Sequence, residues 1–244
     1  MKNITIIDDA LCFGGYTSGK DGTWTRNAPN DPPTEDYALL SQSLGVPLSR
    51  IIRPYQAGGD IVETVGTEHG GMGVIKENIL KRVDGLVTAE KGIVLSVLAA
   101  DCVPIYLIDK KAEVIGLLHC GWRSAAGLLI HNAIEHMKEL GSSPGNIQMI
   151  IGPHICQDCY EVGEDVRKEY SVFFTEKQLE GAFRTINSKL FLDLSEAIKA
   201  KAAEKAIPAQ NISVLNQCTC HDNSFYSYRR GDRNKLNAAF IMIK

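Results

Sequence analysis

The chain has 244 residues, of which 44% are hydrophobic and 23% charged, and its formal net charge is −3. This length can bury a substantial core, and the acidic balance argues against a broad nucleic-acid-binding surface. No run approaches the roughly 18 apolar residues of a membrane span. The first residues lack a signal-peptide core, so we expect a cytoplasmic protein. In that compartment the seven cysteines are expected to be thiols or metal ligands rather than disulfides.

A long surface loop is expected over residues 17–36, which are rich in Gly, Pro, Asn and Asp. A helix capped by Thr34 and ended by Gly45 follows it. Apolar runs of strand length lie at 95–99, 103–108, 113–118, 147–152, 212–215 and 238–243, and helical patterns lie at 124–141, 164–174 and 195–206. This mixture predicts a single mixed α/β domain over residues 1–244, with packed β-sheets covered by outer helices.

Two soft ligand residues flank a hairpin formed by the runs "VPIYLID" and "AEVIGLL". If the two lysines between them form a tight turn, Asp109 pairs with Ala112 and Cys102 lies opposite His119. Facing side chains on one sheet surface are close enough to share a metal ion or a proton. A slip of one residue would instead pair Cys102 with Cys120. The alternative is that Cys102 and His119 are ordinary core residues.

Charged side chains flank this hairpin. Arg123 lies in "HCGWRS", just before an expected helix start, where backbone N–H groups and a guanidinium together favour an anion. Asp101 can orient a ligand or a substrate hydroxyl. In "FYSYRR", Arg229 and Arg230 follow an alternating aromatic run, so at most one of them points into a given pocket. Phosphate recognition is the functional interpretation of that pair, and a solvated edge is the alternative.

Several motifs, in order, resemble the YfiH family, long called multicopper polyphenol oxidoreductases or laccase-domain proteins and now described as purine nucleoside phosphorylases. They are "ADCVPIYLID", "HCGWRS", "GPHICQDCYEVGEDV", "LDLSEAI" and "CTCHDNSFYSYRR". The resemblance runs from about residue 50 to residue 230. It implies one YfiH-like α/β domain and phosphorolysis of adenosine, inosine and methylthioadenosine, with adenosine deamination as a further activity. It also implies a zinc or copper site made by two histidines and one cysteine.

Carried over to this sequence, the resemblance makes Cys102 and His119 metal ligands and, with Arg123, catalytic residues. The third ligand departs from the family pattern Gln-x-His-Gly, because Gly58 stands where the histidine is expected and only Gln56 matches. His69, in a glycine-rich loop, is the nearby histidine that can replace it. Gln56, Asp101, Tyr160, Arg229 and Arg230 are candidate contacts for the nucleoside and phosphate.

Two further cysteine groups have metal-ligand features. "CQDC" supplies Cys156 and Cys159 at C-x-x-C spacing, whereas "CTCH" supplies Cys218, Cys220 and His221 in a C-x-C-H pattern far along the chain. Because the usual knuckle glycines are missing, separate thiols are the favoured interpretation over a second zinc site.

Three other functions stay open beside phosphorolysis. A metal-free hydrolase of the deamidase type would use Cys102 as nucleophile and His119 as base. A degenerate member would bind purines without turnover. Polyphenol oxidation ranks low, because six scattered histidines cannot build a multinuclear copper centre. We expect no nucleic-acid or membrane partner. A homodimer is left open, since a second copy can supply a ligand.

Overall fold

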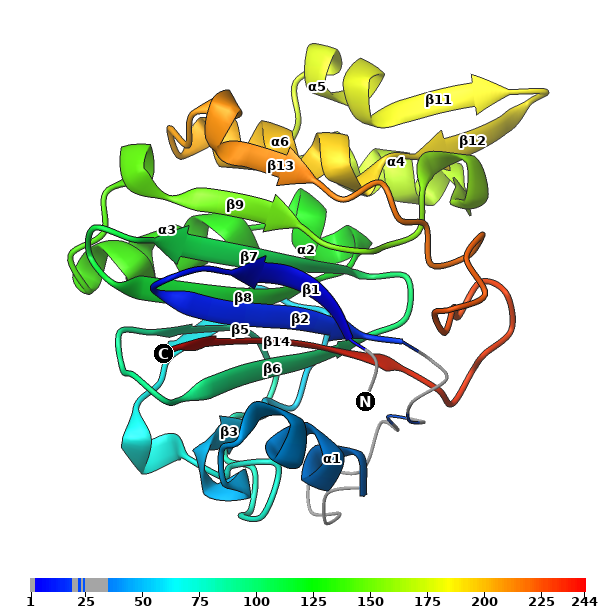
Figure 1. The fold of residues 1–244 in the computed structure, drawn as a ribbon. Helices are drawn as coiled ribbons and strands as arrows, with labels where there is room; N and C mark the ends of the chain where they lie inside the picture. The colour runs from blue at the N-terminus through cyan, green and yellow to red at the C-terminus, as the bar shows by residue number, and fades with distance from the viewer. Residues whose placement is uncertain (1–2, 19–21, 23, 25–34) are drawn as a thin grey trace.

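Two β-sheets stacked face to face form the centre of the molecule in a computed structural model that describes residues 3–18, 22, 24 and 35–244 (Figure 1). The five-stranded sheet has the order β1 (Asn3–Asp8), β2 (Cys12–Thr17), β14 (Asn237–Ile243), β6 (Val94–Ala99) and β3 (Ile51–Ile52). The six-stranded sheet has the order β13 (Ile212–Val214), β9 (Gln148–Ile151), β7 (Val103–Asp109), β8 (Val114–Cys120), β5 (Val83–Thr88) and β4 (Ile61–Thr64).

Helices cover the outer face of each sheet. The five-stranded sheet is covered by α1 (Glu35–Leu44), and the six-stranded sheet by α2 (Trp122–Ala126), α3 (Leu129–Glu139) and α6 (Leu194–Glu204). A small sheet of β10 (Glu161–Val162), β12 (Lys189–Leu192) and β11 (Phe183–Ile186) lies beside α4 (Glu164–Tyr170) and α5 (Glu176–Ala182). The 3₁₀ turns are η2 (Leu48–Arg50), η3 (Thr67–His69), η4 (Pro144–Asn146), η5 (Gln157–Cys159) and η6 (Ala209–Asn211).

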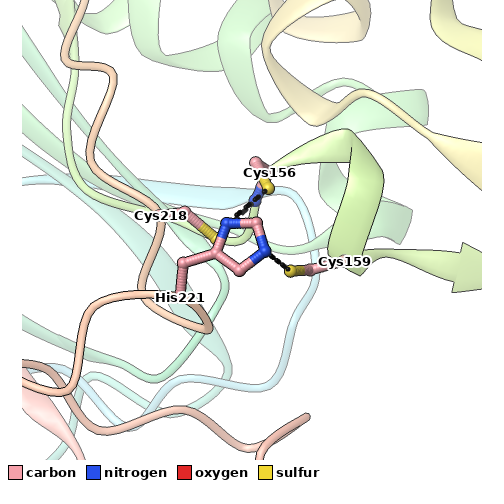
Figure 2. Close-up of side chains that lie close together, drawn as sticks. All are labelled: Cys156, Cys159, Cys218 and His221. Carbon is pink, nitrogen blue, oxygen red and sulfur yellow. Dashed lines mark hydrogen bonds between the residues drawn. The ribbon is translucent and has the colours of Figure 1, made fainter.

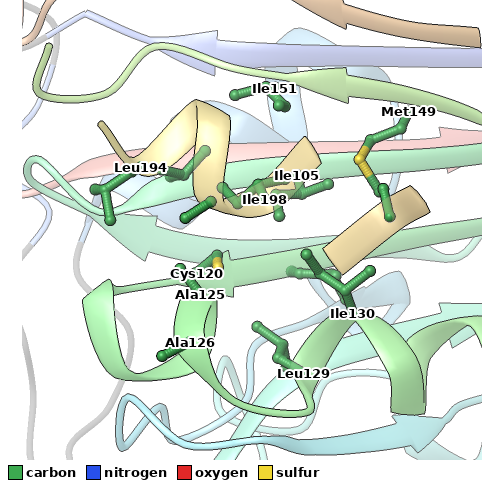
Figure 3. Close-up of a cluster of buried hydrophobic side chains, with 14 of the residues drawn as sticks. Ile105, Cys120, Ala125, Ala126, Leu129, Ile130, Met149, Ile151, Leu194 and Ile198 are labelled. Atoms are coloured by element: carbon green, nitrogen blue, oxygen red, sulfur yellow. The ribbon is translucent and has the colours of Figure 1, made fainter. Parts of the chain in front are cut away.

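The strict alternation of strand side chains explains why two cores form. In β7, Ile105 and Leu107 face the helices, whereas Tyr106 and Ile108 face the other sheet, and all four are fully buried. Figure 3 shows the core on the helix side, where Ile105 lies among side chains of α2, α3 and α6. Each fully buried aliphatic side chain stabilises the fold by about 1.5–3 kcal/mol. The Tyr106 hydroxyl donates to the Gly15 carbonyl at 2.8 Å, which ties the two sheets together.

The expected mixed α/β class, with packed sheets beneath outer helices, is confirmed. The six expected strands and the helix ending before Gly45 are present, whereas β1 to β5, β10, β11 and β12 were not foreseen. Thr34 and most of the expected loop 17–36 lie outside the described residues. No helix of the part described here is long and apolar enough to cross a membrane.

The single helix expected over residues 124–141 is two helices, and Asp60 is the reason. An added Cβ at Gly127 would meet the Asp60 carboxylate at 2.4 Å, so only glycine admits that carboxylate. The same carboxylate accepts the Leu128 N–H at 2.9 Å, and the Asn132 amide donates to the Asp60 carbonyl at 2.8 Å. The break between α2 and α3 therefore anchors the chain that precedes β4.

Candidate active site

A cavity of about 950 Å³ opens at one end of the two stacked sheets. Its wall comes from the end of β6 and the turn into β7, the end of β8, the start of α2, and the segments before β10 and β14. The polar and aromatic side chains in this wall are those of Asp101, Cys102, His119, Trp122, Arg123, Tyr160, Tyr228, Arg229, Arg233 and Asn234. Six of the expected site residues therefore meet here, namely Asp101, Cys102, His119, Arg123, Tyr160 and Arg229.

The hairpin that presents Cys102 and His119 has a different register from the expected one. Asp109 pairs with Val114 rather than Ala112, because its carboxylate accepts the N–H groups of Lys111 and Ala112 and so builds a wider turn. Val103 therefore pairs with Cys120, and neither Cys102–His119 nor Cys102–Cys120 is a cross-strand pair.

Cys102 still reaches His119 because the register shift is two residues, which preserves the faces of the strands. Cys102 lies beside Gly121, where an added Cβ would be 3.4 Å from its sulfur. This makes it the diagonal neighbour of His119, a position within reach of longer side chains. The Cys102 sulfur is near enough to the His119 imidazole to influence its pKa.

A buried aspartate orients the His119 ring. The His119 Nδ1–H donates to Asp84 Oδ1 at 2.8 Å, which leaves Nε2 for Cys102 and for a molecule in the cavity. Burial alone would lower the pKa of His119, but the Cys102 sulfur and the Asp84 carboxylate outweigh it and raise the pKa to about 9. Burial would likewise raise the pKa of Asp84, but the hydrogen bond and charge of His119 lower it overall. Asp84 was not predicted from the sequence, although an acid inside the buried run "VDGLVT" was a usable signal.

Asp101 organises the segment that closes the cavity. Its φ is +81°, a left-handed conformation that aspartate tolerates better than most residues. One carboxylate oxygen accepts the Thr219 hydroxyl at 2.6 Å, and the other accepts the Ser227 hydroxyl at 3.1 Å and the Arg229 N–H at 2.7 Å. The carboxylate thus fixes where Arg229 enters the cavity wall.

The two adjacent arginines have different surroundings. Arg229 lines the cavity, with its guanidinium 5.2 Å from the Tyr160 ring centre and one nitrogen 2.9 Å from the Glu161 carbonyl. Arg230 instead donates to the carbonyls of Thr219, Cys220, Asp222 and Phe225 and to Asp232. Arg230 is therefore committed to its own loop. The alternating strand expected at "FYSYRR" is wrong, because residues 228–230 form a turn, so strand alternation does not explain why the two arginines separate.

Two more arginines line the cavity from the solvent side. Arg123 stacks 3.9 Å over the Trp122 ring and lies 3.8 Å from Glu169, with 63% of its side chain exposed. Arg233 stacks 4.0 Å over the Tyr228 ring. Stacking orients a planar guanidinium and leaves its edge free to bind an anion. Arg233 was not anticipated from the sequence.

The structure gives Gln56 and His69 other partners. The Gln56 side chain forms two hydrogen bonds with the backbone of Leu98, both 2.8 Å long, and it lies outside the wall of the large cavity. His69, in η3, accepts the Gly66 N–H at 3.1 Å and lies 3.0 Å from Glu68. His69 is absent from the cavity wall among the described residues, so the structure does not bring it to Cys102 and His119.

The two cysteine motifs, which we expected to be separate thiols, lie together. Cys156, Cys159, Cys218 and His221 place one ligand atom each within 4.8 Å of all the others (Figure 2). Cys220 is not part of this cluster. The protein therefore has a Cys/His cluster with the composition of a metal site.

Comparison with known proteins gives the family. A family model described as multi-copper polyphenol oxidoreductase laccase matches residues 24–244. The chain belongs to this family. Its relatives within this laccase-like family include adenosine deaminase RL5 of an unknown prokaryotic organism, 34% identical over 78% of this chain and 74% of the relative. A purine nucleoside phosphorylase of Deinococcus radiodurans is 33% identical over 89% of this chain and 80% of the relative.

Solved structures of the laccase-like family share the fold. YlmD from Geobacillus stearothermophilus superposes with a TM-score of 0.86 at 27% identity, covering all of both chains. The hypothetical protein YfiH from Bacillus licheniformis gives 0.85 at 26% identity, covering 96% of this chain and 93% of the other. The expected membership of the YfiH family is confirmed.

The donor atoms at the cavity do not complete the metal site that the laccase-like family implies. Cys102 and His119 provide two ligand atoms, whereas catalytic zinc sites normally have three protein ligands. Residue 58 lies beside them, because the Gly58 N–H donates to the same Asp84 oxygen as His119, at 2.9 Å, but glycine has no side chain to bind a metal. No third His, Cys, Asp or Glu ligand joins Cys102 and His119 within the described ranges.

Proposed function

We propose that the chain is a purine nucleoside phosphorylase-type enzyme that cleaves adenosine, inosine or methylthioadenosine with phosphate in the large cavity. The observation that carries this proposal is the meeting of an Asp84-held imidazole with three arginines and three aromatic rings in one wall. The names of the relatives support the same reaction class. This assignment requires no metal at Cys102 and His119.

The arginines supply the phosphate site in this proposal. Arg229 is fixed through Asp101 and the Glu161 carbonyl, so it offers a preorganised guanidinium edge. Arg123 and Arg233 add charge from the mouth of the cavity. Together they hold the phosphate that attacks C1′ of the sugar and offset the charge that develops in the transition state.

His119 serves the leaving base. With a pKa of about 9, its imidazole is protonated at neutral pH, and Nε2 is the nitrogen that faces away from Asp84. It therefore donates a proton to the purine as the glycosidic bond breaks, which is general acid catalysis. The rings of Trp122, Tyr160 and Tyr228 provide faces on which a purine stacks.

The test is phosphate-dependent release of hypoxanthine from inosine and of adenine from adenosine by purified protein. Arg229→Gln should raise the KM for phosphate at least tenfold, a loss of about 1.4 kcal/mol of binding. Conversion of adenosine to inosine without phosphate would add the deaminase activity. If the pure protein binds purine nucleosides but forms no product, the binding-only function replaces this proposal.

One observation favours a second function, a cysteine hydrolase of the deamidase type. Cys102, His119 and Asp84 lie in the order of a nucleophile, a base and an orienting carboxylate. In metal-free protein, iodoacetamide should then alkylate Cys102 much faster than the buried Cys12 and Cys120, and peptide mass spectrometry measures the three alkylation rates. Asp84→Asn should slow that alkylation, and unchanged kinetics would count against the hydrolase.

A further inference from the structure

We propose that Cys156, Cys159, Cys218 and His221 bind a structural zinc ion that fastens together the two segments forming one wall of the cavity. The sulfur of Cys159 lies 3.0 Å from His221 Nε2, and that of Cys156 lies 3.7 Å from His221 Nδ1. In Figure 2 the imidazole lies between these two sulfurs with Cys218 alongside. Tetrahedral zinc with three thiolates and one imidazole separates its ligand atoms by roughly 3.5–4 Å. The four ligand atoms already lie within 4.8 Å of one another, and zinc binding would turn one imidazole nitrogen towards the three sulfurs.

Local backbone turns create this geometry in place of the missing glycines. In η5 the Cys159 N–H donates to the Cys156 carbonyl at 3.1 Å, which brings the two ends of C-x-x-C to one side of a single turn. In the second motif the Asp222 N–H donates to the Cys218 carbonyl at 2.9 Å. The ligand pattern is therefore C-x-x-C followed by C-x-x-H, and Cys220 packs against the hydrophobic core instead.

The surroundings of one sulfur, that of Cys218, favour a thiolate. The Cys156 N–H donates to the Cys218 sulfur at 3.3 Å, a backbone hydrogen bond of the kind that supports metal ligands. Three thiolates and a neutral imidazole leave one net negative charge after Zn²⁺ binds. The guanidinium groups of Arg229 and Arg230 bond to the carbonyls of Cys159 and Cys220 and lie near enough to offset this charge.

The segment after β13, which the ion would hold, contains little regular secondary structure. Between the end of β13 at Val214 and the start of β14 at Asn237 the described chain has no helix or strand. Loops of this length inside a compact domain are uncommon unless something specific fixes them. The isolated bridge between His154 and Cys218 already brings the two segments together at the cluster.

The ion would act on the cavity through the residues next to its ligands. Tyr160 follows Cys159 directly and lines the cavity, and the Cys159 carbonyl lies 3.4 Å from Arg229. Thr219 follows Cys218 and donates to Asp101. Zinc at the cluster therefore fixes both sides of the wall without contacting the reacting molecules. A soft sulfur-rich tetrahedral set selects zinc over the oxygen-seeking divalent ions.

The experiment measures zinc per chain by plasma mass spectrometry in full-length protein purified under reducing conditions. Wild type, Cys220→Ser and Cys102→Ser should each carry about one zinc ion, whereas Cys218→Ser and His221→Ala should carry almost none. His221→Cys should restore zinc, because a fourth thiolate is an equally good ligand. Cys102→Ser tests whether the zinc lies at Cys102 and His119 instead, and no arm depends on turnover.

A second measurement covers variants that do not fold. Wild-type protein stripped with a chelator and titrated with Co²⁺ should develop sulfur-to-cobalt charge-transfer and tetrahedral d–d absorption, which Cys220→Ser should retain. The proposal is overturned if reduced wild-type protein binds neither metal, if Cys102→Ser removes the zinc, or if freshly reduced protein holds a Cys156–Cys159 disulfide and no zinc. Failure of the phosphorylase assay would leave these results unaffected.

Discussion

Replacing Asp84 by asparagine should destabilise the protein strongly, because the buried carboxylate serves four donors at once. Oδ1 accepts from His119 Nδ1 at 2.8 Å and Gly58 N at 2.9 Å, and Oδ2 accepts from Ala57 N at 3.1 Å and Gly59 N at 2.8 Å. Asparagine keeps one oxygen and turns an amide group towards two N–H donors. Each hydrogen bond to a buried charge contributes about 1.5–3 kcal/mol, so the loss is about 3–6 kcal/mol.

Urea unfolding measures this loss, and Asp109 offers a matched control. Asp109 is equally buried, but one oxygen accepts from both Lys111 and Ala112 and the other only from Ser143. Asp109→Asn should therefore lose one bond, about 1.5–3 kcal/mol, or half the cost of Asp84→Asn. With a slope of ~3 kcal/mol per molar urea, the midpoint should fall by about 1–2 M for Asp84→Asn. Equal midpoints for the two variants would refute the reasoning.

Three further predictions concern the same region. The pKa of His119 is raised from 6.5 to about 9, so protonated His119 stabilises the folded protein fully below pH 6.5, and this contribution is lost as pH rises through 9. The unfolding free energies of wild type and His119→Gln should therefore converge by about 3 kcal/mol over that window. In a Cys218→Ser background, Gly58→His should bind zinc and Gly58→Ala should not. The substitution fits, because an added Cβ at residue 58 meets nothing within 4 Å, and a side chain at a φ of +71° should lower stability by only about 1–2 kcal/mol. Failure to gain zinc would place residue 58 away from the ligands. Arg230→Gln should lower stability by about 2–3 kcal/mol in calorimetry, since its guanidinium holds a loop, while the KM for phosphate changes little compared with Arg229→Gln.

The hairpin shows which part of the fold could be predicted from the sequence. Its apolar alternation placed each strand residue on the correct face, because a buried sheet penalises any odd shift. The turn length was wrong because it depends on one side chain, Asp109, whose hydrogen bonds to the backbone were invisible in the hydrophobic pattern. Faces are set by periodicity, whereas register is set by local turn chemistry.

The site shows what the sequence could not supply. Asp101, Cys102 and His119 were found because they lie in or beside one hairpin. Asp84 was not found, since it reaches His119 across the sheet. The two cysteine motifs were seen by their spacing, but their meeting was not, since Cys156 contacts Cys218 from 62 residues away and such contacts depend on the tertiary fold. Gln56 matches the family motif, but its side chain forms hydrogen bonds with the Leu98 backbone. A motif identifies a residue and does not identify the group that its side chain contacts.

The position of β14 has a consequence for how the protein is made. This strand lies between β2 and β6, so Phe240 pairs with both Gly15 and Ser96. While the ribosome is still adding the residues before Asn237, β2 and β6 have no common neighbour and each offers an open edge. The nascent chain must be kept from pairing with other chains until the residues of β14 have emerged. Asn237 then bonds to the Ala99 carbonyl beside the cavity, so this side of the cavity can assemble only after β14 has been synthesised.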